Sequence, residues 1–260
     1  MNAVANQPLI RTNMNVPTIV AVASIDPLVE PSSSVDFKLT TKTLKNIYGA
    51  TTTDVLPFIV KHMLTYEINT RVRMAAFLAS CFVMSAGFRR KVENYSFTAD
   101  RLYKECHKVD SLTLARSLMR NGEKEIANYL FSFENGNGGI DSNDGWMFRA
   151  RSPLQFRGRN TYELIHKISG IDCVEHPEII EELENSIIAA MIHWQDQGYN
   201  ELSDKIKFSN SFELDVKLTK AGTKNYRSNG AAVKMKKKLS GDTTALLDFC
   251  NFIEMGMLYL

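Results

Sequence analysis

The 260-residue sequence lacks the short motifs that mark several common classes of protein. It contains no P-loop, no G-x-G-x-x-G fingerprint and no H-E-x-x-H zinc motif. Its four cysteines are far apart and include no Cys-x-x-Cys pair, so no zinc or redox spacing occurs. The histidines show no ligand spacing either. We therefore expect no metal and no cofactor.

The sequence also has no large excess of charge of one sign and no long apolar run. The 31 basic and 29 acidic residues give a net charge of +2, which provides no electrostatic case for nucleic acid. No run approaches the ~18 apolar residues that span a membrane. The longest early apolar stretch, residues 16–23, has no basic segment directly before it and is not recognised as a secretory signal. We expect a chain that is cytoplasmic on synthesis and reaches a cell envelope only after release or through a secretion system.

What is present is the composition of an ordinary folded domain, with 44% hydrophobic and 23% charged residues. Three of the four cysteines lie in apolar surroundings, which predicts buried thiols in a reducing compartment. Residues 1–36 differ, because Asn, Pro, Ser and Thr are frequent there. We interpret them as an extended arm or linker with one short strand at 18–22, or else as a disordered tail. Residues 37–260 then form the folded domain.

Helical periodicity dominates from residue 39 onward. Between residues 56 and 64, apolar positions recur at the spacing of one helix face. Pro57 falls in the first turn of that helix, and Thr53 or Asp54 can cap it. Residues 71–83 repeat the pattern with several alanines, and such small side chains permit close packing of helices.

Three further regions complete a mainly α prediction. Residues 111–132 predict two short amphipathic helices around a central glycine, and a loop rich in Gly, Asn and Asp follows at 134–145. Pro177 is predicted to open the longest helix, which Gly198 ends. Two or three more helices are expected from Glu213 to the C-terminus. Strand–helix alternation and internal repeats are absent from the sequence, so the predicted fold class is mainly α.

Three stretches go beyond periodicity. They read RMAAFLASCFVMSAGFRRKVENYSFTADRL at 73–102, DGWMFRARSPLQFRGRNTY at 144–162 and AAMIHWQDQGYNELSD at 189–204. In this order they resemble the glycoside hydrolase family 19 chitinases, and most closely the phage endolysin branch. The family patterns are R-x-A-x-F-L-A-Q-x-x-H-E-S-G-G-F-x-x-x-x-E-N-x-x-Y-S-A-x-R-L, G-D-G-W-x-Y-R-G-R-G-L-I-Q-L-T-G-R-x-N-Y and A-x-W-F-W-x-x-x-G-L-N-x-L-A-D. The resemblance covers roughly residues 39–240.

The resemblance implies a lysozyme-like, two-lobed helical bundle with a central cleft, preceded by the irregular N-terminal arm. The implied ligand is a β-1,4-linked chain of N-acetylated amino sugars, as in cell-wall peptidoglycan or chitin. Aromatic faces and amide side chains suit such a chain, although Trp146 and Tyr162 could instead be core aromatics. The family's binding or framework positions correspond here to Ser80, Val83, Trp146, Phe148, Arg149, Arg151, Gln155, Arg157 and Tyr162.

The most informative feature is a departure from the family pattern at the catalytic positions. Inverting hydrolysis of a glycan needs one carboxylic acid to protonate the leaving oxygen and one carboxylate to activate water. In this match, Val83 occupies the position of the family's His and Met84 that of its general-acid Glu. Glu93 occupies the position of the family's second carboxylate. Methionine carries no transferable proton. A positioned general acid contributes ~10²–10⁴ in rate, so its loss is severe.

Other cleft positions depart in the same direction. Ser80 replaces a family Gln, and Ala150 and Ser152 replace two glycines. Arg157 stands where the family has a small hydroxyl. Residues 220–222 lack a family Asn that contacts sugar or water. Several substitutions at the positions of one cleft indicate a site that has lost its catalytic activity.

We therefore expect a lysozyme-like or chitinase-like pseudoenzyme that binds peptidoglycan-type glycan or a protein partner through the former active-site cleft. The alternative is an active endolysin or chitinase that uses Glu93 with a non-standard second carboxylate. Glu67, Asp100 and Glu105 are the candidates for that second group. A third hypothesis, contact with nucleic acid or membrane through the lysines at 234–238, competes with a solvated helix face.

Overall fold

A computed structural model describes residues 35, 37–49, 54–209, 214, 216–218, 224–226, 230–241, 243 and 245–260. The chain divides after Ser34, and all of these residues belong to the unit Val35–Leu260. Four predicted features lie outside the described residues: the arm at 1–36 except Val35, the strand at 18–22, the Thr53 cap and residues 220–222.

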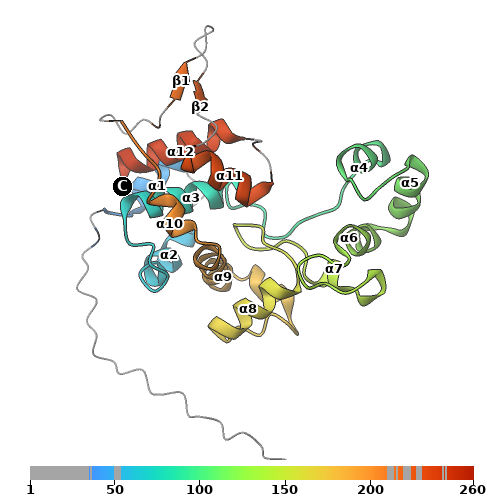
Figure 1. The fold of residues 1–260 in the computed structure, drawn as a ribbon. Helices are drawn as coiled ribbons and strands as arrows, with labels where there is room; N and C mark the ends of the chain where they lie inside the picture. Colours follow the sequence, from blue (N-terminus) through green and yellow to red (C-terminus); the bar gives the residue numbers. More distant parts are fainter. Residues whose placement is uncertain are drawn as a thin grey trace, which may run out of the picture. The chain divides into compact units, whose positions relative to one another are not determined.

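The described chain is mainly α-helical, as the sequence predicts (Figure 1). Its helices are α1 (Thr41–Tyr48), α2 (Leu56–His62), α3 (Arg71–Met84), α4 (Ala99–Glu105), α5 (Leu112–Asn121), α6 (Glu123–Phe131), η2 (Ile140–Ser142), α7 (Asp144–Met147), α8 (Arg159–Ser169), η3 (Pro177–Glu181), α9 (Leu183–Asp196), α10 (Tyr199–Ser203), α11 (Ala231–Ser240) and α12 (Leu246–Tyr259). None of these described helices is long and apolar enough to cross a membrane.

Three details differ from the sequence-based predictions. The N-cap of α2 is Val55, which makes no side-chain capping bond, although Pro57 does fall in the first turn. Pro177 opens only the short η3, because the extended backbone of Glu182 separates it from α9. The region after Glu213 includes an antiparallel pair, β1 (Val216–Leu218) with β2 (Lys224–Tyr226). Strands of three residues are too short to show an alternating pattern in the sequence.

The larger hydrophobic core is built around α3, α9 and α12. Helices α3 and α12 lie side by side (Figure 1), and a Cβ at Gly256 would come within 2.6 Å of the Ala75 Cβ. The small residues predicted in α3 therefore do permit close packing. Trp194 of α9 is fully buried and meets Phe77 edge-on at 5.4 Å.

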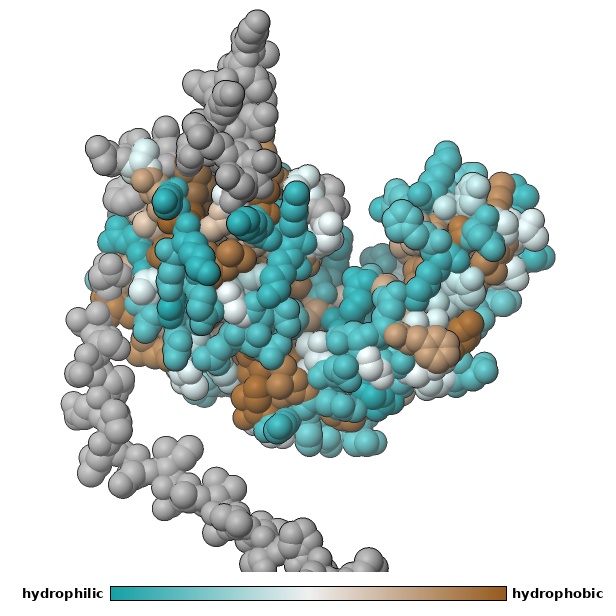
Figure 2. Space-filling view, viewed as in Figure 1, coloured by the Kyte–Doolittle hydropathy of each residue, from teal (hydrophilic) through white to brown (hydrophobic). Residues whose placement is uncertain are grey.

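A second, separate hydrophobic cluster is formed by α4, α5 and α6 together with Tyr95. Trp146 and Phe131 pack against its side. The face in Figure 2 is mostly hydrophilic, with brown confined to separate patches, so the apolar side chains of the described residues lie largely inside these two clusters.

The predicted burial of the thiols is confirmed, and none of the four cysteines forms a disulfide within the described chain. Three are buried, and the fourth, Cys106, is half-buried. Burial raises the pKa of the Cys173 thiol to about 11, so this group is an unreactive thiol at neutral pH.

Candidate functional site

The end of α3 fixes the position of Met84. Ser85 caps the helix: its hydroxyl donates to the Cys81 carbonyl at 2.6 Å and accepts from the Phe88 N–H at 2.7 Å. Gly87 follows with φ +79°, and its N–H closes the turn on Phe82 O at 2.7 Å. The chain therefore reverses immediately after Met84, which leaves this side chain half-buried in the last helical turn.

Glu93 is held by a short extended segment. Its N–H donates to Ala150 O at 2.8 Å, and Val92 pairs with Arg151 in an antiparallel bridge. The Ala150 N–H returns to Glu93 Oε2 at 3.3 Å. Both the backbone and the carboxylate of Glu93 are thus attached to the segment that carries the Arg-Ala-Arg motif.

That segment then turns back on itself and brings Arg157 beside Glu93. Arg151 pairs with Phe156 across a turn in which Ser152 and Gln155 have positive φ. At the end of the turn Gly158 has φ +90°, and a Cβ there would meet the Asn135 side chain at 2.5 Å. Glycine is therefore required at this position.

The central contact of the site is an ion pair between Arg157 and Glu93. Arg157 Nη2 donates to Glu93 Oε1 at 3.3 Å, and the guanidinium lies 4.4 Å from the centre of the Phe131 ring. Tyr95 Oη donates to the other carboxylate oxygen, Oε2, at 3.1 Å. Burial and the nearby Glu93 raise the pKa of the Tyr95 hydroxyl well above its ordinary value, so it stays a donor. Each oxygen of Glu93 already accepts a hydrogen bond.

Glu93 lines a pocket of about 310 Å³, which we call the Glu93 pocket. Its wall combines aromatic side chains, among them Phe97 and Phe131, with charged ones such as Lys108. Arg157 lines this pocket and also a second one of about 520 Å³, the Met84 pocket. The two pockets therefore meet at Arg157. Their volumes fall within the ~300–1,000 Å³ typical of ligand sites.

The Glu93 pocket contains a second carboxylate that the sequence analysis missed. Glu134, from the loop after α6, lines the pocket and forms an ion pair with Lys108 at 2.8 Å. Among the described residues, the lining of neither pocket includes Glu67, Asp100 or Glu105. Glu134 lies between the two matched stretches, in a loop for which the family pattern gives no signal.

The predicted binding residues divide into accessible and buried groups. Gln155 and Arg157 line the Met84 pocket, whereas Val83 lines a different pocket together with Phe252. Trp146 is half-buried, with the Arg149 guanidinium 3.9 Å from its ring centre. The fully or almost fully buried members are Ser80, Phe148, Arg151 and Tyr162.

The buried members act as framework. The Ser80 hydroxyl donates to Ala76 O at 2.7 Å. Arg151 is 3% exposed, and its guanidinium donates to Glu181 at 3.0 Å and to the Tyr162 hydroxyl at 3.0 Å. Tyr162 in turn donates to Arg149 O, and burial raises its pKa to about 12. These residues support the segment that carries Arg157.

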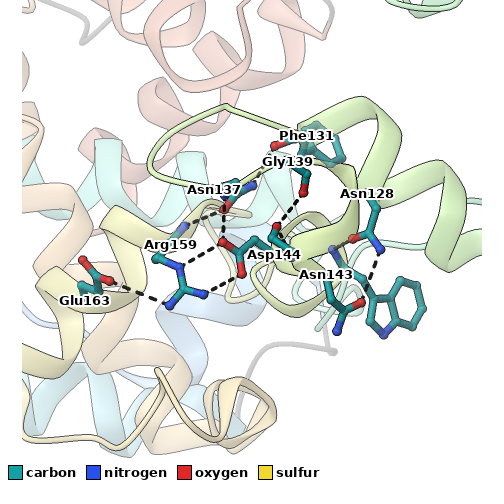
Figure 3. Close-up of polar contacts among 11 residues, drawn as sticks. Asn128, Phe131, Asn137, Gly139, Asn143, Asp144, Arg159 and Glu163 are labelled. Atoms are coloured by element: carbon teal, nitrogen blue, oxygen red, sulfur yellow. Dashed lines mark hydrogen bonds and ion pairs between the residues drawn. The ribbon is translucent and has the colours of Figure 1, made fainter.

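A buried polar network anchors the loop around Glu134 and the start of α7 (Figure 3). Asp144 is 3% exposed and accepts two hydrogen bonds from Arg159, at 2.6 and 3.0 Å. Burial opposes ionisation of Asp144, but the bonds from Arg159 and the Gly138 N–H outweigh it and lower its pKa. Asn128 accepts from the Trp146 N–H at 2.8 Å. Asp144, Arg159 and Asn128 of this network hold the segment that carries Trp146, and these three residues line neither pocket.

No family model matches the chain. Over 135 residues it is 33% identical to a protein of Haemophilus influenzae named as a glycosyl hydrolase family 19 domain-containing protein. The match covers 51% of this chain and 66% of the relative. This similarity supports glycoside hydrolase family 19 at the level of the family. On the family 19 pattern, Glu93 is the retained carboxylate position and Met84 occupies the position of the acid.

Proposed function

We propose that this protein binds a chain of N-acetylated amino sugars of the peptidoglycan type through the two pockets that meet at Arg157, and does not cleave it. The observation that carries the proposal is the ion pair between Arg157 and Glu93, on a chain whose acid position is Met84.

Both halves of an inverting mechanism are affected. A general acid must hold a proton near the glycosidic oxygen, and Met84 has none to give. A general base must have a carboxylate oxygen free to receive a proton from water. In Glu93, Oε1 accepts from Arg157, and Oε2 accepts from Tyr95 and the Ala150 N–H. Met84 thus removes the acid, and Arg157 engages the base through one oxygen of its carboxylate.

The binding half of the proposal is supported by the lining of the Glu93 pocket. Phe97 and Phe131, both half-buried, present aromatic surface there, next to Lys108 and Glu134. A sugar ring offers apolar CH faces and polar edges, and mixed aromatic and polar linings suit such ligands. The similarity to a family 19 domain-containing protein also favours a glycan.

A second candidate is an active hydrolase that uses Glu93 and Glu134, because both carboxylates line one pocket. The ion pair with Lys108 argues against it, since the Lys108 ammonium lies 2.8 Å from Glu134 Oε1 and holds that oxygen. Activity that depends on Glu134 would favour this candidate. The Glu134→Gln variant, with its Lys108 partner intact, is the direct test.

The proposal is tested by measuring two properties of the purified protein on isolated peptidoglycan. We expect co-sedimentation with the insoluble wall and no release of reducing ends. Phe131→Leu, in the Glu93 pocket, should weaken binding about tenfold, which corresponds to the loss of one good aromatic contact. Tyr103→Leu is the matched control, because Tyr103 is an exposed aromatic outside that lining. Failure to bind, or equal effects of the two variants, would contradict the proposal.

A further inference from the structure

The Met84 pocket has an unusual balance of charge. Its lining includes Arg157 and Lys238, and among the described residues that form it none is Asp or Glu. The nearest part of α9 does carry Asp196, but this residue is exposed, does not line the pocket and accepts a hydrogen bond from Gln197. Two cations therefore face a cavity without a carboxylate of its own.

The positions of these two cations are fixed by other contacts. The Lys238 ammonium, on α11, donates to Gln197 O and lies 5.3 Å from the centre of the Tyr199 ring. Arg157 is held over Phe131 and pairs with Glu93 on the side of the other pocket. Each cation thus stays at the rim of the Met84 pocket through contacts that leave further N–H groups available.

The remaining ionisable group in the lining adds no charge. Burial lowers the pKa of His193 to about 4, so the imidazole is neutral at pH 7. Its Nδ1 is buried and has no hydrogen-bond partner. The positive character of the pocket at neutral pH therefore comes from Arg157 and Lys238.

We propose that the Met84 pocket accepts a carboxylate carried by a sugar of the bound glycan, such as the lactyl ether carboxylate that an N-acetylated amino sugar bears where no stem peptide is joined to it. The inference rests on the proposed function, because the Met84 pocket is one of the two pockets proposed to bind the glycan. It names the kind of sugar that enters this pocket. A single substitution explains both properties of the site. Met84 removes the proton donor, and it also leaves no carboxyl at this position that could ionise and repel an anionic sugar from Arg157 and Lys238.

The experiment compares three soluble probes by titration calorimetry at low ionic strength. The first is a neutral tetramer of N-acetylglucosamine. The second is a tetramer in which N-acetylglucosamine alternates with N-acetylmuramic acid and the lactyl carboxylates are free. The third is the acidic stem peptide alone. We expect the acidic tetramer to bind about tenfold more tightly than the neutral one, as one exposed charge contact allows, and the peptide to bind weakest.

Two variants and a control locate the effect. Lys238→Gln and Met84→Glu should each lower the ratio of the affinity for the acidic tetramer to that for the neutral tetramer from about tenfold toward one. Lys237→Gln is the control, since Lys237 is exposed on the same helix and does not line the pocket. Melting curves of all three variants show whether each is folded.

The outcomes separate this inference from the function on which it rests. Equal binding of the neutral and acidic tetramers, or a preference that survives Lys238→Gln, overturns the carboxylate subsite and leaves glycan binding intact. Tightest binding of the stem peptide overturns the assignment of the carboxylate to a sugar. Absence of binding to both tetramers and to the insoluble wall contradicts the proposed function as well.

Discussion

Arg157 Nη2 lies 3.3 Å from Glu93 Oε1, so the carboxylate that we propose as the former general base is held in an ion pair. This relationship predicts how activity can be restored. Met84→Glu with Val83→His should regain little hydrolysis, because Arg157 still engages Glu93. Adding Arg157→Thr should raise the release of reducing ends at least tenfold over that double variant, which is part of the ~10²–10⁴ that a positioned acid or base contributes.

The matched control for that series replaces Arg157→Thr with Arg116→Thr, which removes an exposed arginine of α5 that lines neither pocket. If the two triple variants were equally active, the ion pair with Arg157 would not be what prevents Glu93 from acting as a general base. The rate is measured with labelled peptidoglycan, and the fold of each variant is checked by its melting temperature.

The sequence predicted the helical class, the two helices at 111–132 and the close packing of α3, because these depend on local periodicity and residue size. It also marked Met84 and Arg157 as departures. It could not show that Arg157 contacts Glu93, since the two lie 64 residues apart and meet only through the turn that ends at Gly158. Glu134 was missed for a similar reason, because a loop carboxylate has no periodic signal.

The residues that sequence comparison assigned to binding include several that the fold buries. Side-chain type alone does not distinguish a ligand contact from a structural one, as Arg151 shows. Arginine suits recognition of polar ligands, but here its guanidinium is 3% exposed and joins Glu181 to Tyr162. Only the three-dimensional environment identifies such a residue as framework.

The buried position of Arg151 predicts a large effect on stability. Arg151→Met leaves Glu181 without its partner and Met147 O without a donor, and should lower the free energy of unfolding by about 3 kcal/mol. This is near the low end for buried pairs, because Glu181 is partly exposed. Urea denaturation of Arg101→Met, whose pair with Glu105 is exposed, provides the comparison and should change stability by less than about 1 kcal/mol. Equal losses would show that burial of Arg151 is not the cause.

The contact between α3 and α12 predicts a specific pair of compensating substitutions. Gly256→Ala adds a Cβ 2.6 Å from that of Ala75, and overpacking of about 1–3 kcal/mol should exceed the gain in helix propensity. Ala75→Gly removes the obstructing methyl group. The double variant should therefore be more stable than the sum of the single effects indicates. Additive effects in a denaturation cycle would contradict close contact at this point.

His193 predicts a loss of stability in acid. Its pKa in the folded protein is lowered to about 4 by burial, against 6.5 in the unfolded chain, so unfolding takes up a proton between these values. The contribution is fully present above pH 6.5 and is lost as the pH falls toward 4. Between pH 7 and 4.5 it amounts to about 2 kcal/mol. His193→Phe should reduce the pH dependence of unfolding by this amount, and an unchanged slope would show that the imidazole does not titrate as a buried group.

The most direct test of the account is the rate at which the purified wild-type protein releases reducing ends from isolated peptidoglycan, measured beside Glu93→Gln. We expect both proteins to co-sediment with the wall and both rates to equal the protein-free blank, because Met84 gives no proton and Glu93 is paired with Arg157. Brisk release by the wild type that Glu93→Gln abolishes would contradict the account and identify an active hydrolase.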